Sequence, residues 1–369
     1  MSKNASRNTA LNGICPYFTM FPLDFPYSIL SRHASEGQWV IDPFCGRGTT
    51  NYASRLLGLP SIGIDSSGVA AALTEAKLAN TSPQSILRAA QRILEEVGTP
   101  CHVPTGEFWE WAYHPDVLNV LCRLREGLLS DCNSDSRKAL RAILMGALHG
   151  PLGKTKQSYF SNQCPRTYAP KPSYSVRFWK ARDLNPNRVD VLRIITDRAI
   201  RYYAKEPKNA VGRIICGDSR SRTLYSRRKI RSPISWVITS PPYYGMNTYI
   251  SDQWLRQWFV GGQSIVDYSN QEQMQHSSPE YFALQLKQVW QNVGSICVPD
   301  ARLVIRFGGI NERKNDSLPI LKNSLKDSGW RIQTIKSAGT ASKGYRQADH
   351  FTKAEAAREE HDIWATWKG

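Results

Sequence analysis

The spacing of apolar residues predicts alternating strands and helices near both ends of the chain. Short apolar runs at 39–42 and 61–65 predict strands, and helical periodicity follows each of them, at about 49–57 and 69–78. Further strand-like runs lie at 213–216, 236–239, 302–306, 330–335 and 362–367. Strands and helices that alternate at this spacing are typical of an α/β fold with a doubly wound sheet.

The alternation is interrupted in the middle of the chain. Residues 84–150 carry helical periodicity, residues 150–180 read as a basic and aromatic loop, and a further helix is predicted at 189–203. We therefore expect an α/β domain with a helical, basic insertion. The expected segments are a loose N-terminal tail at 1–12, the first half of the α/β domain at 13–80, the insertion at 81–210 and the second half at 211–369.

Composition and charge narrow the class of protein. Of 369 residues 41% are hydrophobic, which is enough for a core and excludes a disordered or low-complexity chain. The 48 Lys and Arg residues exceed the 31 Asp and Glu residues by 17. Such an excess favours a polyanionic partner, because each phosphate contact releases counterions. The alternative is a basic protein without such a partner.

The cysteines and histidines predict no metal site, and the N-terminal residues predict no signal peptide. The eight cysteines are scattered without zinc-type spacing, so we expect reduced thiols. No metal-ligand pairing of the seven histidines is evident. The first residues lack the apolar run of a signal peptide, and no stretch has the length of a membrane span. These features predict a cytoplasmic protein.

A glycine-bearing turn follows the first predicted strand. Gly46 and Gly48 lie in the segment DPFCGRGTT, residues 42–50, where backbone can turn sharply and approach a ligand. The following helix lacks the GxxxxGK[ST] continuation of a phosphate-binding loop. Asp65 ends the second strand, at the spacing of a carboxylate that accepts from ribose hydroxyls. An adenosyl ligand fits this pattern, and a tight turn without a ligand is the alternative.

A second polar segment, Ser240-Pro241-Pro242-Tyr243, directly follows the strand at 236–239. The two prolines stiffen the backbone and have no N–H group, so the segment presents acceptors beside an aromatic ring. This display suits a planar base with an exocyclic amino group, because acceptors bind the amine hydrogens and the ring stacks on the base. A proline-rich turn without such a function is the alternative.

The two segments together resemble the signature motifs of the DNA amino-methyltransferases. The residues that carry the resemblance are DPFCGRGTT at 42–50 and TSPPY at 239–243. FPLDFP at 21–26 is similar to the family's cofactor-side segment, and GDS at 217–219 resembles its acidic turn at the cofactor adenine. The similarity covers residues 17 to about 80 and 211 to about 310. It implies a Rossmann-like class I methyltransferase sheet and S-adenosylmethionine as the methyl donor.

The resemblance also implies roles for particular residues. Catalysis is expected at Ser240, Pro241, Pro242 and Tyr243. Cofactor binding is expected at Phe18, Asp42, Phe44, Cys45, Gly46, Gly48, Thr49, Asp65, Ser66, Asp218 and Ser219. Within the family a serine in the tetrapeptide is associated with cytosine N4 and an aspartate with adenine N6. Double-stranded DNA is the implied partner, a cognate restriction endonuclease is left open, and a bacterial or archaeal cytosol or nucleoid is the implied location.

The insertion is expected to recognise the DNA. Residues 151–210 contain 13 basic and 4 acidic residues, a net charge of +9, with aromatic residues between them. Basic and aromatic groups together can contact phosphates and stack on bases. We expect DNA contacts at Lys171, Arg177 and Lys180. The alternative is a solvated cationic face without a partner.

Three other functions are compatible with parts of this pattern. A methyltransferase acting on a guanosine amino group of RNA needs the same display, but we find no RNA-binding module ahead of the glycine motif. A DNA-binding protein with a vestigial methylase site is disfavoured because the motif residues are intact. A carbon-5 cytosine methylase would need a nucleophile such as Cys164, which lies in the insertion without a supporting base.

Overall fold

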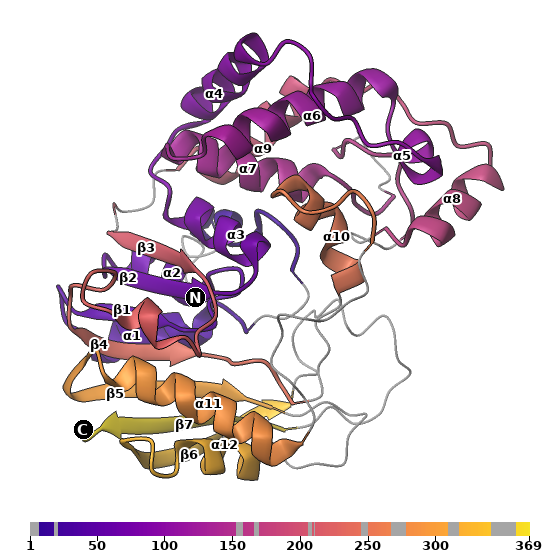
Figure 1. The fold of residues 1–369 in the computed structure, drawn as a ribbon. Coiled ribbons are helices and arrows are strands. Elements are labelled where there is room, and N and C mark those ends of the chain that lie inside the picture. Colours follow the sequence, from indigo (N-terminus) through magenta and orange to yellow (C-terminus); the bar gives the residue numbers. More distant parts are fainter. Residues whose placement is uncertain are drawn as a thin grey trace. The chain divides into compact units, whose positions relative to one another are not determined.

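The computed structural model describes residues 7–17, 21–152, 158–165, 170–205, 209, 211–244, 250–266, 278–308, 317–340 and 359–369. Contacts divide the chain into two compact units (Figure 1). The sheet unit comprises Tyr17–Thr74, Lys208–Thr248 and Gln271–Gly369. The helical unit comprises Met1–Pro16, Glu75–Pro207 and Tyr249–Asn270.

The described part of the sheet unit contains a seven-stranded mixed sheet in the order β3-β2-β1-β4-β5-β7-β6. The first five strands in this order, β3, β2, β1, β4 and β5, are parallel to one another, while β7 runs antiparallel to both of its neighbours. The strands are β1 (Trp39–Asp42), β2 (Ser61–Asp65), β3 (Gly212–Cys216), β4 (Ile234–Thr239), β5 (Cys297–Phe307), β6 (Trp330–Thr340) and β7 (Glu359–Trp367). This order with an antiparallel β7 is that of a class I methyltransferase sheet, which confirms the fold expected from the sequence.

Both faces of the sheet are covered because the strands are apolar on both sides. Ile41 and Val237 pack against helices α11 (Pro279–Gly294) and α12 (Ser317–Leu325) on one face. Their neighbours Val40, Trp236 and Ile238 pack on the other face, against α1 (Asp24–His33) and α2 (Thr49–Leu56). Figure 1 shows α11 and α12 lying along the strands they cover. The sequence pattern did not lead us to predict α11 or α12.

The helical unit contains most of the predicted insertion. Its helices are α4 (Pro83–Glu96), α5 (Glu107–Ala112), α6 (Pro115–Ser130), α7 (Asp135–Ala147), α8 (Pro172–Lys180), α9 (Val191–Tyr203) and α10 (Ile250–Phe259). Helix α3 (Gly68–Leu78) crosses the division between the units. Trp254, Trp258 and Phe259 of α10 are buried, as their helical spacing predicts.

One element of this unit corrects the sequence prediction. Residues 172–180 form the helix α8, although their basic and aromatic composition reads as a loop. Ser175, Val176 and Trp179 are buried on one face of α8, which is the spacing of a helix. Pro172 occupies the first turn, where its missing N–H costs nothing. The hydrophobic stripe is too short to stand out from the charged residues around it.

The N-terminal segment differs from the loose tail expected for residues 1–12. Part of the expected N-terminal tail is ordered, because Arg7–Gly13 form a 3-10 helix, η1, in which Leu11 is buried. A search of the described helices finds none with the length and apolarity needed to cross a membrane.

Candidate active site

The expected site residues of the sheet unit lie at one edge of the sheet. Asp42 ends β1, Asp65 ends β2, and Ser240 directly follows β4. Because these strands are parallel, their carboxyl ends meet at the same edge. The chain changes direction across the sheet between β1 and β4, and ligands of open α/β sheets bind at such a switch point.

Asp42 joins the two motifs directly. Its Oδ1 accepts hydrogen bonds from the Phe44 N–H at 3.0 Å and from the Thr239 hydroxyl at 2.6 Å. Asp42 is fully buried, and its Oδ2 has no hydrogen-bond partner among the described residues. Burial raises the pKa of Asp42 to about 7, against the hydrogen bonds from Thr239 and Phe44 that lower it. A buried carboxyl oxygen without a partner is costly, and a donor on a ligand would remove that cost.

The glycine turn requires its glycines. Gly46 and Gly48 have φ values of 51° and 78°, in the left-handed region that side chains disfavour. A Cβ on Gly48 would lie 2.5 Å from Cγ2 of Thr74. The Thr74 hydroxyl lies 3.0 Å from the Gly46 carbonyl oxygen and 3.7 Å from the buried Cys45 Sγ. The turn is therefore fixed from α3 as well as from its own backbone.

Asp65 is tied to the same turn. Its Oδ2 accepts from the Gly46 N–H at 2.8 Å, and its Oδ1 accepts from the Ser67 N–H at 2.9 Å. Burial raises the pKa of Asp65 although both hydrogen bonds lower it. Each carboxylate oxygen has two lone pairs, so one acceptor position per oxygen remains for a ligand. Ser66 is exposed beside it.

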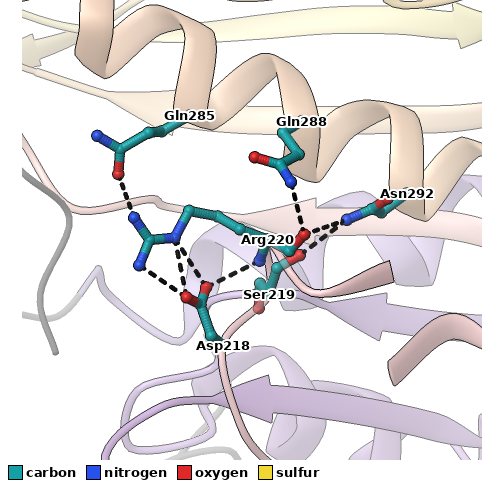
Figure 2. A network of polar contacts seen from close by, with 6 residues as sticks. All are labelled: Asp218, Ser219, Arg220, Gln285, Gln288 and Asn292. Atoms are coloured by element: carbon teal, nitrogen blue, oxygen red, sulfur yellow. Dashed lines mark hydrogen bonds and ion pairs between the residues drawn. The ribbon is translucent and has the colours of Figure 1, made fainter. Parts of the chain in front are cut away.

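The loop after β3 is held by a polar network from α11, drawn in Figure 2. Both carboxylate oxygens of Asp218 accept from the Arg220 guanidinium, the closest pair being 2.7 Å apart. Partial burial favours a higher pKa for Asp218, but the hydrogen bonds and charge of Arg220 outweigh it and hold that pKa below its usual value. Arg220 also donates to Gln285, and the Asn292 amide donates to the Arg220 and Ser219 carbonyls.

Ser219 connects this loop to the first motif. Its side chain is buried, and its hydroxyl donates to the carbonyl oxygen of Pro43. Phe44, the next residue, is half-buried with its ring edge-on to Trp290 of α11 at 6.1 Å. The loops after β1 and β3 are thus anchored to each other and to α11.

The tetrapeptide continues from the end of β4. Pro241 is buried, while Ser240, Pro242 and Tyr243 are half-buried. The Tyr243 ring lies edge-on to Phe307 at 5.3 Å, and its hydroxyl donates to Glu360 Oε1 at 3.0 Å. The Thr50 hydroxyl of α2 donates to the Ile238 carbonyl of β4 at 3.2 Å, which adds a second link between the two motifs.

These residues fit S-adenosylmethionine. Asp42 and Asp65 offer carboxylate oxygens with unused acceptor capacity, which suits ammonium and ribose hydroxyl donors. Gly46 and Gly48 allow close approach, and Cys45 and Thr49 are buried behind the turn. Phe18, the remaining expected cofactor contact, lies outside the described residues.

Of the three expected DNA contacts, Arg177 and Lys180 belong to α8 of the helical unit and Lys171 directly precedes it, and all three are exposed. Lys171 and Arg177 line a groove of about 570 Å³, together with Tyr174 and the start of α5. Lys180 is not among the residues that line the groove, but it forms an ion pair with Glu107, which is one of them. The Arg182 guanidinium lies 4.2 Å from the Phe178 ring centroid, and Phe178 stacks on Tyr174 at 6.3 Å. The exposed face of α8 is therefore both basic and aromatic.

Cys164 is a poor nucleophile in this structure. It is fully buried in the helical unit, and burial raises its thiol pKa, so the reactive thiolate is disfavoured. Within the described ranges, no group of three or more His, Cys, Asp or Glu side chains could hold a metal ion.

Several residues of the site were given no role from the sequence: Thr239, which was noted only as part of the TSPPY segment, and Thr74, Arg220, Asn292, Phe307 and Glu360. Thr239 carries a signal that could have been used, because a buried strand that ends in a threonine beside Ser240 places a hydroxyl at the motif. Glu360 carries none, because its partner Tyr243 is 117 residues away.

Comparison with known proteins supports the motif assignment for the first part of the chain. Residues 2–75 match the sequence profile of the N6- and N4-type DNA methylase family. A segment of 72 residues is 39% identical to the Type II methyltransferase M.MjaII of Methanocaldococcus jannaschii. That segment is 20% of this chain and only 14% of the relative's length.

Solved structures show weak overall similarity. The rRNA methyltransferase aviRa of Streptomyces viridochromogenes superposes with a TM-score of 0.38 and 14% identity, covering 99% of this chain and 93% of that one. An rRNA methylase of Streptococcus thermophilus gives a TM-score of 0.35 and 8% identity, covering 96% and 100% of the two chains.

The matched segment contains the glycine turn, Asp42 and Asp65, which lie at the switch point of the sheet. The family match and the sheet together identify S-adenosylmethionine as the cofactor. Residues 2–75 of this chain are therefore similar to DNA methylases of the N6 and N4 type, and the chain spans only 14% of the length of the curated relative that it matches.

Proposed function

We propose that this protein transfers a methyl group from S-adenosylmethionine to the exocyclic amine of a base extruded from double-stranded DNA. Cytosine N4 is the favoured acceptor because the tetrapeptide begins with Ser240, and adenine N6 is the second choice. The observation that supports this most directly is the 2.6 Å hydrogen bond from Thr239 to Asp42. It ties the strand that precedes the tetrapeptide to the cofactor turn.

The chemistry requires acceptors beside the amine. An amino group conjugated with a base ring is a weak nucleophile, and its lone pair becomes available when its hydrogens are held out of the ring plane. The Ser240 hydroxyl and the Pro241 carbonyl are the proposed acceptors, and neither proline can donate a competing N–H. Bound S-adenosylmethionine would supply the methyl group to this nitrogen, and the methylated amine would release one proton to solvent. Orientation and fixed dipoles supply most of the acceleration.

Tyr243 is the proposed stacking platform for the extruded base. Extrusion costs a few kcal/mol, and an aromatic platform recovers roughly 1–3 kcal/mol per base. The half-buried ring of Tyr243 is already packed edge-on to Phe307, so little freedom is lost when a base arrives. An ordered platform makes stacking more favourable than a mobile one does.

The helical unit is the proposed DNA-binding region. The groove at Lys171 and Arg177 combines two cations with the half-exposed ring of Tyr174. Such a groove suits a phosphate next to an apolar base or sugar. The ion pair of Lys180 with Glu107 leaves Lys180 as the weakest of the three proposed contacts.

The proposal is tested by incubation with radiolabelled S-adenosylmethionine and DNA from a host that lacks the gene, followed by nucleoside analysis. We expect label in N4-methylcytosine. Label in N6-methyladenine would change the base while keeping the reaction. Label only in a parallel RNA sample, or none in wild-type protein that binds the cofactor, would contradict the proposal.

A further inference from the structure

A buried carboxyl group lies beside the proposed catalytic tetrapeptide. Glu360 is near the start of β7, and only 6% of its surface is exposed. Because β7 runs antiparallel to β5, its beginning lies where β5 ends, with His361 paired to Phe307. That is the edge at which the parallel strands carry the site residues, so Glu360 belongs to this edge by topology as well as by contact.

Three segments meet around this carboxyl group. The Tyr243 hydroxyl donates to Glu360 Oε1 at 3.0 Å, and the Tyr243 ring packs against Phe307 at 5.3 Å. Gly308, which follows β5, completes the arrangement. A Cβ at this position would lie 2.9 Å from Glu360 Cγ and 3.5 Å from the Tyr243 ring. The close approach of Glu360 and Tyr243 therefore depends on a glycine between them.

Packing alone does not account for Glu360. A buried carboxyl group costs free energy relative to an apolar side chain of similar size unless its hydrogen bonds compensate. A leucine at this position would fill the space beside Tyr243 and Gly308 without that cost. The hydrogen bond from the Tyr243 hydroxyl to Glu360 fixes the direction of the ring more closely than the edge-on contact with Phe307 does.

We propose that Glu360 is a positioning residue, which holds the Tyr243 ring in the orientation that receives the extruded base. This inference rests on the proposed function, because it assigns Glu360 a role through the stacking residue. Glu360 acts on the base side of the reaction and leaves cofactor binding unaffected. Gly308 serves the same purpose by leaving room for the Glu360 side chain.

A double-mutant cycle tests the coupling. Tyr243→Phe removes the donor, Glu360→Leu removes the acceptor, and Glu360→Gln keeps an acceptor oxygen. We expect each of the first two to lower kcat by about tenfold, the effect of losing one buried hydrogen bond. The double variant should be no slower than either single variant, Glu360→Gln should recover most of the activity, and affinity for S-adenosylmethionine should stay unchanged. Multiplicative losses in the double variant would overturn the proposal.

A second measurement does not depend on methyl transfer. With 3-fluorotyrosine at position 243, the fluorine resonance reports the ring's surroundings in the full chain without DNA. We expect one sharp resonance that shifts and broadens in Glu360→Leu, returns in Glu360→Gln and is unaltered in Glu280→Gln, a charge-matched change at an exposed residue of α11. An unchanged resonance in Glu360→Leu would overturn the positioning role. Wild-type protein with the expected spectra but without methyl transfer would overturn the proposed function alone.

Discussion

The cofactor side and the base side of this site are built in different ways. On the cofactor side, Asp42 and Asp65 accept from backbone N–H groups a few residues away or in the neighbouring turn. On the base side, Tyr243 is held by Phe307 and Glu360, which come from β5 and β7. Local backbone contacts give the first side a motif that can be recognised in a sequence. On the base side the tetrapeptide is recognisable too, but Phe307 and Glu360, which the sheet topology brings beside Tyr243, belong to no such motif.

We expect substitutions on the base side to lower methyl transfer without weakening cofactor binding. Tyr243→Ala should lower methyl transfer by about 100-fold, because stacking of the extruded base is worth roughly 1–3 kcal/mol and the hydrogen bond to Glu360 is lost as well. Affinity for S-adenosylmethionine, measured by calorimetry, should remain that of the wild type. Ser240→Ala should likewise lower kcat without weakening cofactor binding. Full activity in Tyr243→Ala would remove the tetrapeptide from the active site.

A substitution on the cofactor side should weaken cofactor binding instead. Asp65→Ala should weaken S-adenosylmethionine binding by about 1.5–3 kcal/mol, the worth of hydrogen bonds to a charged group. The carboxylate also fixes Gly46, so the turn itself loosens. Calorimetry on a variant whose circular dichroism matches the wild type provides the measurement. A well-folded variant with unchanged affinity would show that Asp65 does not contact the cofactor.

On the cofactor side, affinity for S-adenosylmethionine should depend on pH through Asp42. With a pKa raised to about 7 by burial, Asp42 is protonated in acid and ionised above neutrality. A cationic cofactor favours the ionised form, so affinity should rise by up to about tenfold per pH unit below 7 and level off above it. Titrations from pH 5.5 to 8.5 measure this. In Asp42→Asn the rise should disappear, and a wild-type affinity independent of pH would contradict the assignment.

Asp42 should also affect the stability of the free protein. The folded state holds its proton up to pH 7, whereas the unfolded chain releases it near pH 3.8. Because the native state binds more protons between these values, the free energy of unfolding contributed by Asp42 falls as pH rises from about 4 to 7. Urea unfolding at several pH values should show a shallower decline in Asp42→Asn. An identical decline in both proteins would place the titrating group elsewhere.

The smallest expected effect concerns the helical unit. Replacing Lys171, Arg177 and Lys180 by Ala should weaken DNA binding. The slope of the logarithm of the binding constant against the logarithm of the salt concentration should become shallower by up to about 0.9 for each lost phosphate contact. Lys180→Ala alone should have less effect than Lys171→Ala, because Lys180 already pairs with Glu107. Binding titrations at several salt concentrations measure the slopes. A wild-type slope in the triple variant would make these residues a solvated face.

The sequence predicted the α/β fold and the positions of its strands, because period-2 and period-3.6 patterns are local. The periodicity did not predict that β7 lies between β5 and β6, since strand order depends on contacts far apart in the chain. Only the resemblance to class I methyltransferases implied this order. Helix α8 was missed because Val176 and Trp179 are a short apolar stripe among cations. Glu360 was missed for the same reason as the strand order, because a lone carboxylate in a strand gives no sign of its neighbour.

The place of β7 in the sheet has a consequence for the order of folding. Residues 359–367 are synthesised after β6 but are inserted between β5 and β6, so β5 and β6 cannot reach their final neighbours until this strand has left the ribosome. Strands β1 and β2, with Asp42 and Asp65, can pair much earlier because their separation along the chain is short. A nascent chain would thus complete its cofactor turn well before it acquires the carboxylate that orients Tyr243.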